Sequence, residues 1–286
     1  MSKWQKSPSR RQFLSGSAAA VAGSMSAGAA AAQTPDPLIT QVQDWASYAG
    51  DGVDEVRYGL PIRFEDDVVR RNVPWLTADP ISSINFTPIH ALDGTITPQG
   101  CAFERHHSGA IELRKQDYRL MVNGLVDRPI ILTYADLERL PRVNHVYFCE
   151  CAANTGMEWA GAQLNGAQFT HGMIHNMEYT GVPLRLVLQQ AGLAAAEDLS
   201  NKWVFVEGAD ASSNGRSIPM EKALDDVIVA FKANGEALRK EHGYPVRLVV
   251  PGWEGNLWVK WLRRIEVTDR SVESREETSK YTDVLA

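Results

Sequence analysis

The stretch NHVYFCECAANTGMEW, residues 144–159, decides the fold of this chain because it changes from a strand pattern to a turn pattern. Strict alternation predicts a strand that turns its even-numbered residues to one face and its odd-numbered residues, Cys149 and Cys151 among them, to the other. The small and turn-forming residues AANTG at 152–156 then end the ladder. The sequence therefore predicts that Cys151 lies where a strand runs into a loop.

Two interpretations of these cysteines remain open. Buried cysteines usually pack as small hydrophobic side chains. A thiolate at the end of a strand, beside a loop that lets backbone approach closely, is also the ligand that a soft transition metal prefers. The chain has three cysteines, too few for a closed disulfide framework, so we expect packing to stabilise the fold.

The composition is that of an ordinary globular protein: 286 residues, of which 44% are hydrophobic and 22% charged. The formal net charge is -6 and no polybasic run occurs, so nucleic acid is not an expected partner.

The first residues resemble an export signal. SRRQFL at 9–14 has the consecutive arginines of a twin-arginine signal, and a weakly apolar Ala/Gly/Ser stretch follows at 15–32. A generic secretory peptide or membrane anchor is the alternative, although alanine-rich stretches make poor membrane spans. We therefore expect a signal peptide over 1–32, a periplasmic location and no membrane span.

The rest of the chain mixes strands with short helices and has no β-α-β rhythm, which predicts an α+β fold of mixed sheets. Residues 33–83 are expected to form an irregular N-terminal arm punctuated by prolines, and 271–286 a polar tail. Strands are expected at 119–126, 130–133, 202–206, 227–233, after the Asn234-Gly235 turn, at 247–250 and at 259–267. Helices are expected from Thr133 to before Pro141, at 182–191 and at 218–225.

Two segments are expected to be connections. Residues 163–180 form a long one, in which His171 and His175 would share a face if it were helical. Residues 212–217, SSNGRS, form a glycine-containing loop that can offer amides to an oxyanion.

Polar and cationic residues gather in loops. Glu104, Arg105, His106 and His107 lie in the loop-rich region 84–109, where a solvated loop and an anion-binding loop both fit. Nucleotide-binding glycine loops and the G-x-S-x-G elbow of hydrolases do not occur. A thiolate combined with scattered cations suits an organic cofactor that has a phosphate tail and a sulfur-bound metal. These cations are Arg105, His107, His242, Arg247 and Lys260.

Seven short motifs follow one another in an order that resembles the sulfite oxidase family, and most closely its sulfane dehydrogenase group. The resemblance covers about Phe86 to Asp283. The motifs are FERHH at 103–107, CAAN at 151–154, EGAD at 207–210, SIP at 217–219, HGYPVR at 242–247, VPGWEG at 250–255 and WVKWL at 258–262.

The resemblance implies a molybdopterin-binding catalytic domain over 84–270 that holds one Mo-molybdopterin, with Cys151 as the metal ligand. It implies that Arg105, Cys151 and Arg216 are the catalytic residues, with Arg105 facing the substrate oxyanion. It also implies a set of cofactor-binding residues: Phe103, Glu104, Arg105, His106, His107, Cys151, Asp210, His242, Arg247, Trp258, Val259 and Lys260.

The implied activity is oxidation of a sulfur substrate by oxygen-atom transfer. The electrons would pass to a separate c-type cytochrome, since no C-x-x-C-H site occurs and no haem is expected in this chain. The substrate would be sulfane sulfur on a carrier protein, or free sulfite. Gly156 and Asn214 stand where sulfite oxidases carry an arginine and a tyrosine, and Arg216 follows on the same loop, which suits a bulkier substrate.

A rival from another class is an inactive, truncated, cofactor-free module. Members of the sulfane dehydrogenase group usually continue into an immunoglobulin-like dimerisation domain, which we expect this chain to lack. Assembly of this chain into a homo-oligomer is left open as an alternative.

Overall fold

The computed structural model describes residues 61, 63–77, 82–193, 199–279 and 281. The predicted signal peptide and residues 33–60 of the predicted arm lie outside the described residues. Within the described residues, no helix combines the length and the apolar run that crossing a bilayer requires.

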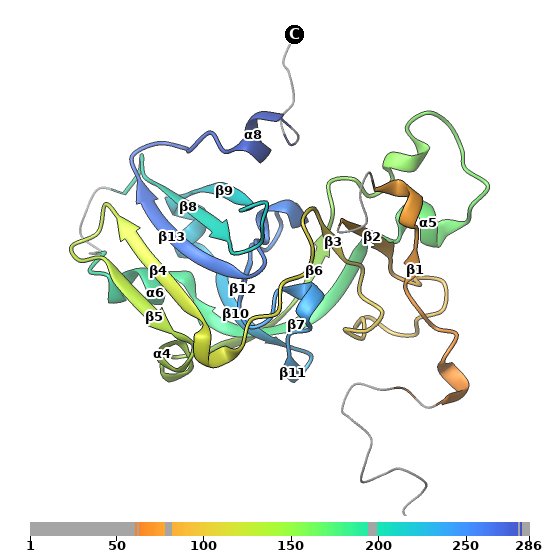
Figure 1. Cartoon of the computed structure of the whole chain (residues 1–286), viewed down its shortest axis with the longest axis horizontal. Coiled ribbons are helices and arrows are strands. Elements are labelled where there is room, and N and C mark those ends of the chain that lie inside the picture. The colour runs from red at the N-terminus through yellow and green to blue at the C-terminus, as the bar shows by residue number, and fades with distance from the viewer. Residues whose placement is uncertain (1–60, 62, 78–81, 194–198, 280, 282–286) are drawn as a thin grey trace, which may run out of the picture. The chain divides into compact units, whose positions relative to one another are not determined.

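The described strands form three sheets joined by short helices (Figure 1). The first contains β1 (Arg71–Asn72), β2 (Ser83–Phe86) and β3 (Arg105–His106), all antiparallel. The second runs β11 (Glu236–Ala237), β10 (Ile228–Ala233), β7 (Ile174–Pro183) and β6 (Val143–Glu150), with β12 (Arg247–Val249) also paired to β10. The third runs β5 (Ile130–Thr133), β4 (Arg119–Gly124), β13 (Leu262–Thr268), β8 (Trp203–Gly208) and β9 (Gly215–Pro219). The prediction of an α+β fold with mixed sheets is confirmed, since β4 and β13 run parallel in an otherwise antiparallel sheet.

The helices are short and lie between strands. The α-helices are α4 (Tyr134–Arg139), α5 (Ala167–His171), α6 (Leu184–Gln190), α7 (Met220–Asp225) and α8 (Arg275–Ser279). Single 3-10 turns occupy Arg63–Glu65, Pro74–Leu76, Lys115–Asp117, Gly156–Glu158, Lys240–His242 and Gly255–Leu257. The predicted start of α4 is confirmed: Thr133 and Asp136 form a capping box, in which each side chain accepts a hydrogen bond from the other's backbone N–H.

The predicted alternation in β6 is confirmed. Cys149 and Cys151 are buried, whereas Val146 and Phe148 on the opposite face are half exposed. The strand ends at Glu150, and the Cys151 N–H then donates to the Met173 carbonyl. This places Cys151 at the point where backbone pairing gives way to a loop.

The expectation of a long connection over 163–180 is wrong in its second half. Residues from Ile174 form β7, whose buried Met177 and Tyr179 alternate with half-buried neighbours. His171 ends α5 while His175 lies on β7, so the two histidines do not share a helical face. The period-2 pattern was present in the sequence, but the glycines and histidines before it suggested a loop.

Three further boundaries differ from the sequence expectation. Gly215 to Ser217 are not loop but part of β9, because they pair with β8. Residues 259–261 precede β13 instead of belonging to it, and Trp261 has a positive φ of 51°. Within the predicted polar tail, α8 packs beside β9, and Glu276 is buried there.

A buried apolar layer lies within the third sheet. It is built from alternate residues of three adjacent strands. The strands contribute Leu120 and Val122, Val204 and Val206, and Ile265 and Val267. This layer holds β8 and β13 rigid, and the loops at their ends carry site residues described below.

Gly124 allows β4 to end against β13. Its φ is +87°, and a Cβ atom there would lie 2.1 Å from the Val267 carbonyl oxygen. We expect Gly124→Ala to lower the free energy of unfolding by about 3 kcal/mol or more, measured by denaturant titration, because backbone strain and a collision add.

Gly235 is the matched control. It has a φ of +75°, but no heavy atom lies within 4 Å of the added Cβ. Gly235→Ala should lower the free energy of unfolding by only about 1–2 kcal/mol, which is the cost of the left-handed conformation. Equal losses in the two variants would show that the collision at Gly124 is relieved by a small movement of β13.

Candidate functional site

A cavity open to solvent collects residues from all three sheets. It is lined by Phe103, Glu104, Arg105, His106, His107, Cys149, Cys151, His175, Asp210, Ser212, Asn214, Arg216, His242, Arg247, Gly255, Asn256, Trp258, Lys260, Trp261 and Tyr281.

The structure brings the predicted site residues together here, apart from Val259. The Val259 side chain is buried, and it does not line the cavity. Residues scattered over more than 150 positions of the sequence therefore meet around one space. The roles assigned to them remain predictions.

Sequence reasoning missed several lining residues. His175 could have been found by pairing β6 with β7, because their register sets it opposite Cys149. Tyr281 carried no signal of its own. The preceding Ser274-Arg-Glu-Glu277 does fit the S-x-x-E pattern of a helix start, which marks an ordered element within the tail.

Two cations, the buried Arg247 and the half-buried Lys260, line the cavity. The Arg247 guanidinium donates to the carbonyls of His242 and Trp258 at 3.2 and 3.1 Å. Lys260 Nζ donates to the Arg105 and Glu241 carbonyls, both at 2.9 Å. Burial, assisted by the nearby Arg247 charge, lowers the pKa of Lys260 to about 7. These carbonyl oxygens offset the charge of the two cations only in part.

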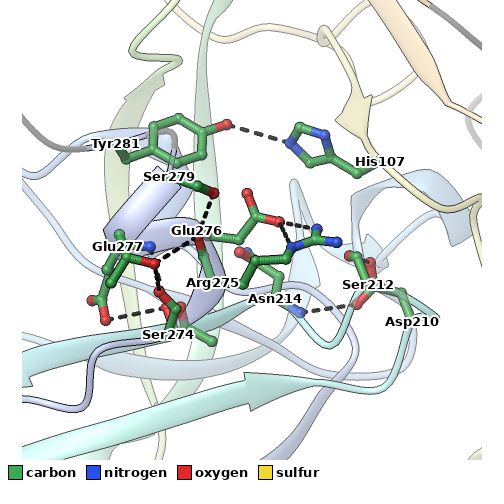
Figure 2. A network of polar contacts seen from close by, with 12 residues as sticks. His107, Asp210, Ser212, Asn214, Ser274, Arg275, Glu276, Glu277, Ser279 and Tyr281 are labelled. Carbon is green, nitrogen blue, oxygen red and sulfur yellow. Dashed lines mark hydrogen bonds and ion pairs between the residues drawn. The ribbon is translucent and has the colours of Figure 1, made fainter.

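The carboxylates at the cavity are already engaged. Asp210 accepts a short hydrogen bond from the Ser212 hydroxyl (Figure 2). Glu104 accepts from Ser83 Oγ at 2.8 Å and lies 3.5 Å from the Arg70 guanidinium. The lining therefore presents more positive than negative charge to its contents, and such a wall attracts an anion.

Three buried histidines each leave one ring nitrogen without a partner in the described chain: His106, His175 and His242 at Nδ1. Burial is the main cause that lowers the pKa of each, to about 4 for His106 and well below the usual value for the other two. All three are therefore neutral at pH 7. An unsatisfied buried polar atom costs about 1–3 kcal/mol, so these atoms indicate a ligand that completes their hydrogen bonds.

The mouth of the cavity carries the side chains that can reach a substrate. The Arg105 guanidinium is 3.0 Å from His107 Nδ1 and donates to the His106 carbonyl at 2.6 Å. The buried Arg216 donates to the Asn256 and Gly215 carbonyls at 3.2 and 3.1 Å. Two guanidinium groups at one mouth can bind a sulfur or phosphorus oxyanion in bidentate fashion.

The two cysteines at the cavity differ in how readily they ionise. Burial raises the pKa of Cys149 to about 12. Burial also raises the pKa of Cys151, but a hydrogen bond from the Ala153 backbone and the Arg105 charge act against it. Cys151 is therefore the better of the two thiols for giving a thiolate to a metal.

The fold and the site define a class of protein that binds an anionic cofactor in a cavity lined by cations, neutral histidines and two thiols. The donor set fits a molybdopterin: buried cations and unpartnered histidine nitrogens suit its phosphate and polar ring atoms, and Cys151 suits its metal. The chain belongs to the oxidoreductase molybdopterin-binding domain family, whose model matches residues 107–276.

Named relatives agree with this assignment. Mitochondrial sulfite oxidase of Mus musculus is 34% identical over 227 residues, which cover 76% of this chain and 40% of that protein. NADH nitrate reductase of Volvox carteri is 36% identical over 187 residues, or 62% of this chain and 22% of that protein. The chain thus spans between a fifth and two fifths of these curated relatives.

A solved structure is much more similar. The sulfane dehydrogenase SoxCD from Paracoccus pantotrophus is 69% identical, with a TM-score of 0.78, over 88% of this chain and 64% of that one. The mixed-sheet molybdopterin-binding fold is therefore shared with that protein.

Lys260 gives the cofactor-free protein a stability that depends on pH. The pKa of its ammonium group is about 7 in the fold and ordinarily 10.5, so the unfolded chain binds one more proton between these pH values. The free energy of unfolding should therefore rise with pH from about 7 to 9, before unfolded thiols and phenols ionise.

Lys260→Met should flatten this rise, measured by denaturant titration at several pH values. Lys202→Met, outside the cavity, is the control and should leave it unchanged. A flat profile in the unsubstituted protein would mean that the carbonyl partners of Lys260 keep it charged in the fold.

Proposed function

We propose that this chain holds one Mo-molybdopterin and oxidises a sulfur substrate, most fittingly sulfane sulfur on a carrier protein. The observation that carries the proposal is the cavity, where buried cations, three unpartnered histidine nitrogens and the Cys151 thiol surround one space. The 69% identity to a sulfane dehydrogenase supports the sulfur chemistry.

The proposed role of each residue follows from its position in the cavity. Arg247, Lys260 and His242 would hold the phosphate and ring atoms of the cofactor, and Cys151 would hold its metal. When bound, the cofactor supplies two-electron oxygen-atom transfer to sulfur. Arg105 and Arg216 would then bind the anionic sulfur-oxygen group at the mouth and stabilise charge that develops on its oxygens.

The loop after Cys151 supports the proposal of a substrate presented on a polypeptide arm. Gly156, in the loop after Cys151, leaves room, since an added Cβ would meet nothing nearer than the Trp159 ring at 3.9 Å. Trp159 itself is 80% exposed, so an apolar surface extends outward from this loop. An arm that carries a persulfide could lie along this surface while its terminal sulfur reaches the cavity.

The proposal includes a location and partners. SRRQFL at 9–14 supports export to the periplasm by the twin-arginine route, which carries proteins that have already folded around a cofactor. A separate c-type cytochrome would accept the electrons one at a time. Sulfite dehydrogenase activity on free sulfite is the second candidate, favoured by the two guanidinium groups at the mouth.

The choice of metal ligand can be tested on the two cysteines. Cys151→Ser should lower the molybdenum content measured by mass spectrometry and reduce sulfur oxidation by about 10³-fold or more, because the hard hydroxyl is a poor ligand for a soft metal. Cys149→Ser is the matched control and should leave most of both. The reverse result would assign the metal to Cys149.

Steady-state kinetics separate the two substrates. We expect kcat/KM to be at least about tenfold higher for a carrier protein that bears sulfane sulfur than for sulfite, because the exposed mouth adds contacts in the transition state. A higher value for sulfite would favour the second candidate. A purified protein without molybdenum would support the inactive module.

A further inference from the structure

Residues 274–279, which follow β13 and include α8, attach to the strand that carries Arg216 (Figure 2). Ser274 Oγ donates to the Gly215 carbonyl at 2.8 Å, and the Glu277 carboxylate accepts from the Ser217 N–H at 2.7 Å. The segment then turns back, since the Tyr281 N–H donates to the Glu276 carbonyl at 3.1 Å. These bonds fix where the Tyr281 side chain enters the mouth of the cavity.

Tyr281 lies between two walls of the mouth. Its hydroxyl oxygen is 3.4 Å from His107 Nε2, and its ring centre is 4.6 Å from the Arg216 guanidinium carbon. It lines the same cavity as Cys151 and Arg105. The ring over the guanidinium is a cation–π contact, which keeps Arg216 in place without neutralising it.

The hydrogen bonds assign a direction to the phenolic proton. A guanidinium can only donate, so His107 Nδ1 accepts from Arg105 at 3.0 Å. In the neutral ring the proton is then on Nε2, which donates to the Tyr281 oxygen. The O–H of Tyr281 is thereby directed to a different acceptor, and the cavity that it faces is built for an anion.

We propose that Tyr281 is a substrate-binding residue that donates a hydrogen bond to the sulfur-bound oxygen held by Arg105 and Arg216. The inference rests on the proposed function for the identity of the substrate. It adds a neutral donor, supplied by the segment after β13, to the two guanidinium groups.

Tyr281→Phe tests the proposal because it removes the hydroxyl and keeps the ring over Arg216. In the molybdenum-containing protein, we expect the Kd for sulfate, measured by calorimetry, to rise about tenfold, as does the KM for sulfite, with kcat changed less. The molybdenum content should be unchanged. Thr278→Ala, on the exposed side of α8, is the control and should match the unsubstituted protein.

Two results would overturn the proposal: a sulfate Kd in Tyr281→Phe equal to that of Thr278→Ala, or loss of molybdenum, which would make Tyr281 a cofactor contact. If Tyr281→Phe does not fold, Glu277→Gln replaces it. That change weakens the attachment to β9, and the sulfate Kd should rise in the same direction; an unchanged Kd would again count against Tyr281.

The outcome is separable from that of the proposed function. Sulfate needs only the cations and the phenol, so its binding tests Tyr281 even if the protein oxidises no sulfur compound. An unsubstituted protein that lacks molybdenum or activity would refute the proposed function. If the protein is active but its sulfate Kd does not change when the Tyr281 hydroxyl is removed, only the inference is refuted.

Discussion

Positive charge held at the cavity mainly by backbone carbonyls is the constraint on which the rest of the structure depends. Arg247 and Lys260 are surrounded by backbone carbonyls, and the nearby His242 is held neutral by its burial. Buried charges of one sign are costly unless a counter-charge arrives. The protein is thus arranged to be completed by an anionic ligand, and burial together with the Arg247 charge lowers the pKa of Lys260 to about 7 without one.

Paired strands of two sheets hold this arrangement in place. The pairing of β6 with β7 sets Cys149 opposite His175, so one strand pair delivers both a thiol and an imidazole to the cavity. The β8–β9 pair brings Arg216 from another sheet. Each of these side chains sits on or beside a paired strand, which limits its movement more than a free loop would. The cation cluster can therefore persist despite its own repulsion.

How far the sequence predicts this site depends on how local the signal is. Cys151 was placed correctly at the end of a strand because alternation and the AANTG turn are both visible within 16 residues. The two-residue strand β3 was missed, since Arg105 and His106 pair only with partners 21 and 23 residues earlier, Ile84 and Ser83. Arg247 and Lys260 were grouped with the thiolate as scattered loop cations, and the resemblance to a known family then assigned them to the cofactor site. The position of Tyr281 depends on contacts with β9 and His107, for which the neighbouring residues carry no sequence signal.

The two cysteines show how a strand end can select a metal ligand. The period of two puts Cys149 and Cys151 on the same face, so side-chain direction cannot distinguish them. Cys149 lies inside the paired strand, where burial raises its pKa to about 12. Cys151 lies one residue past the end, where the chain turns and the Ala153 backbone can donate to its sulfur. Burial thus raises the pKa of both thiols, opposed by Arg247 at Cys149 and by the Ala153 backbone and Arg105 at Cys151.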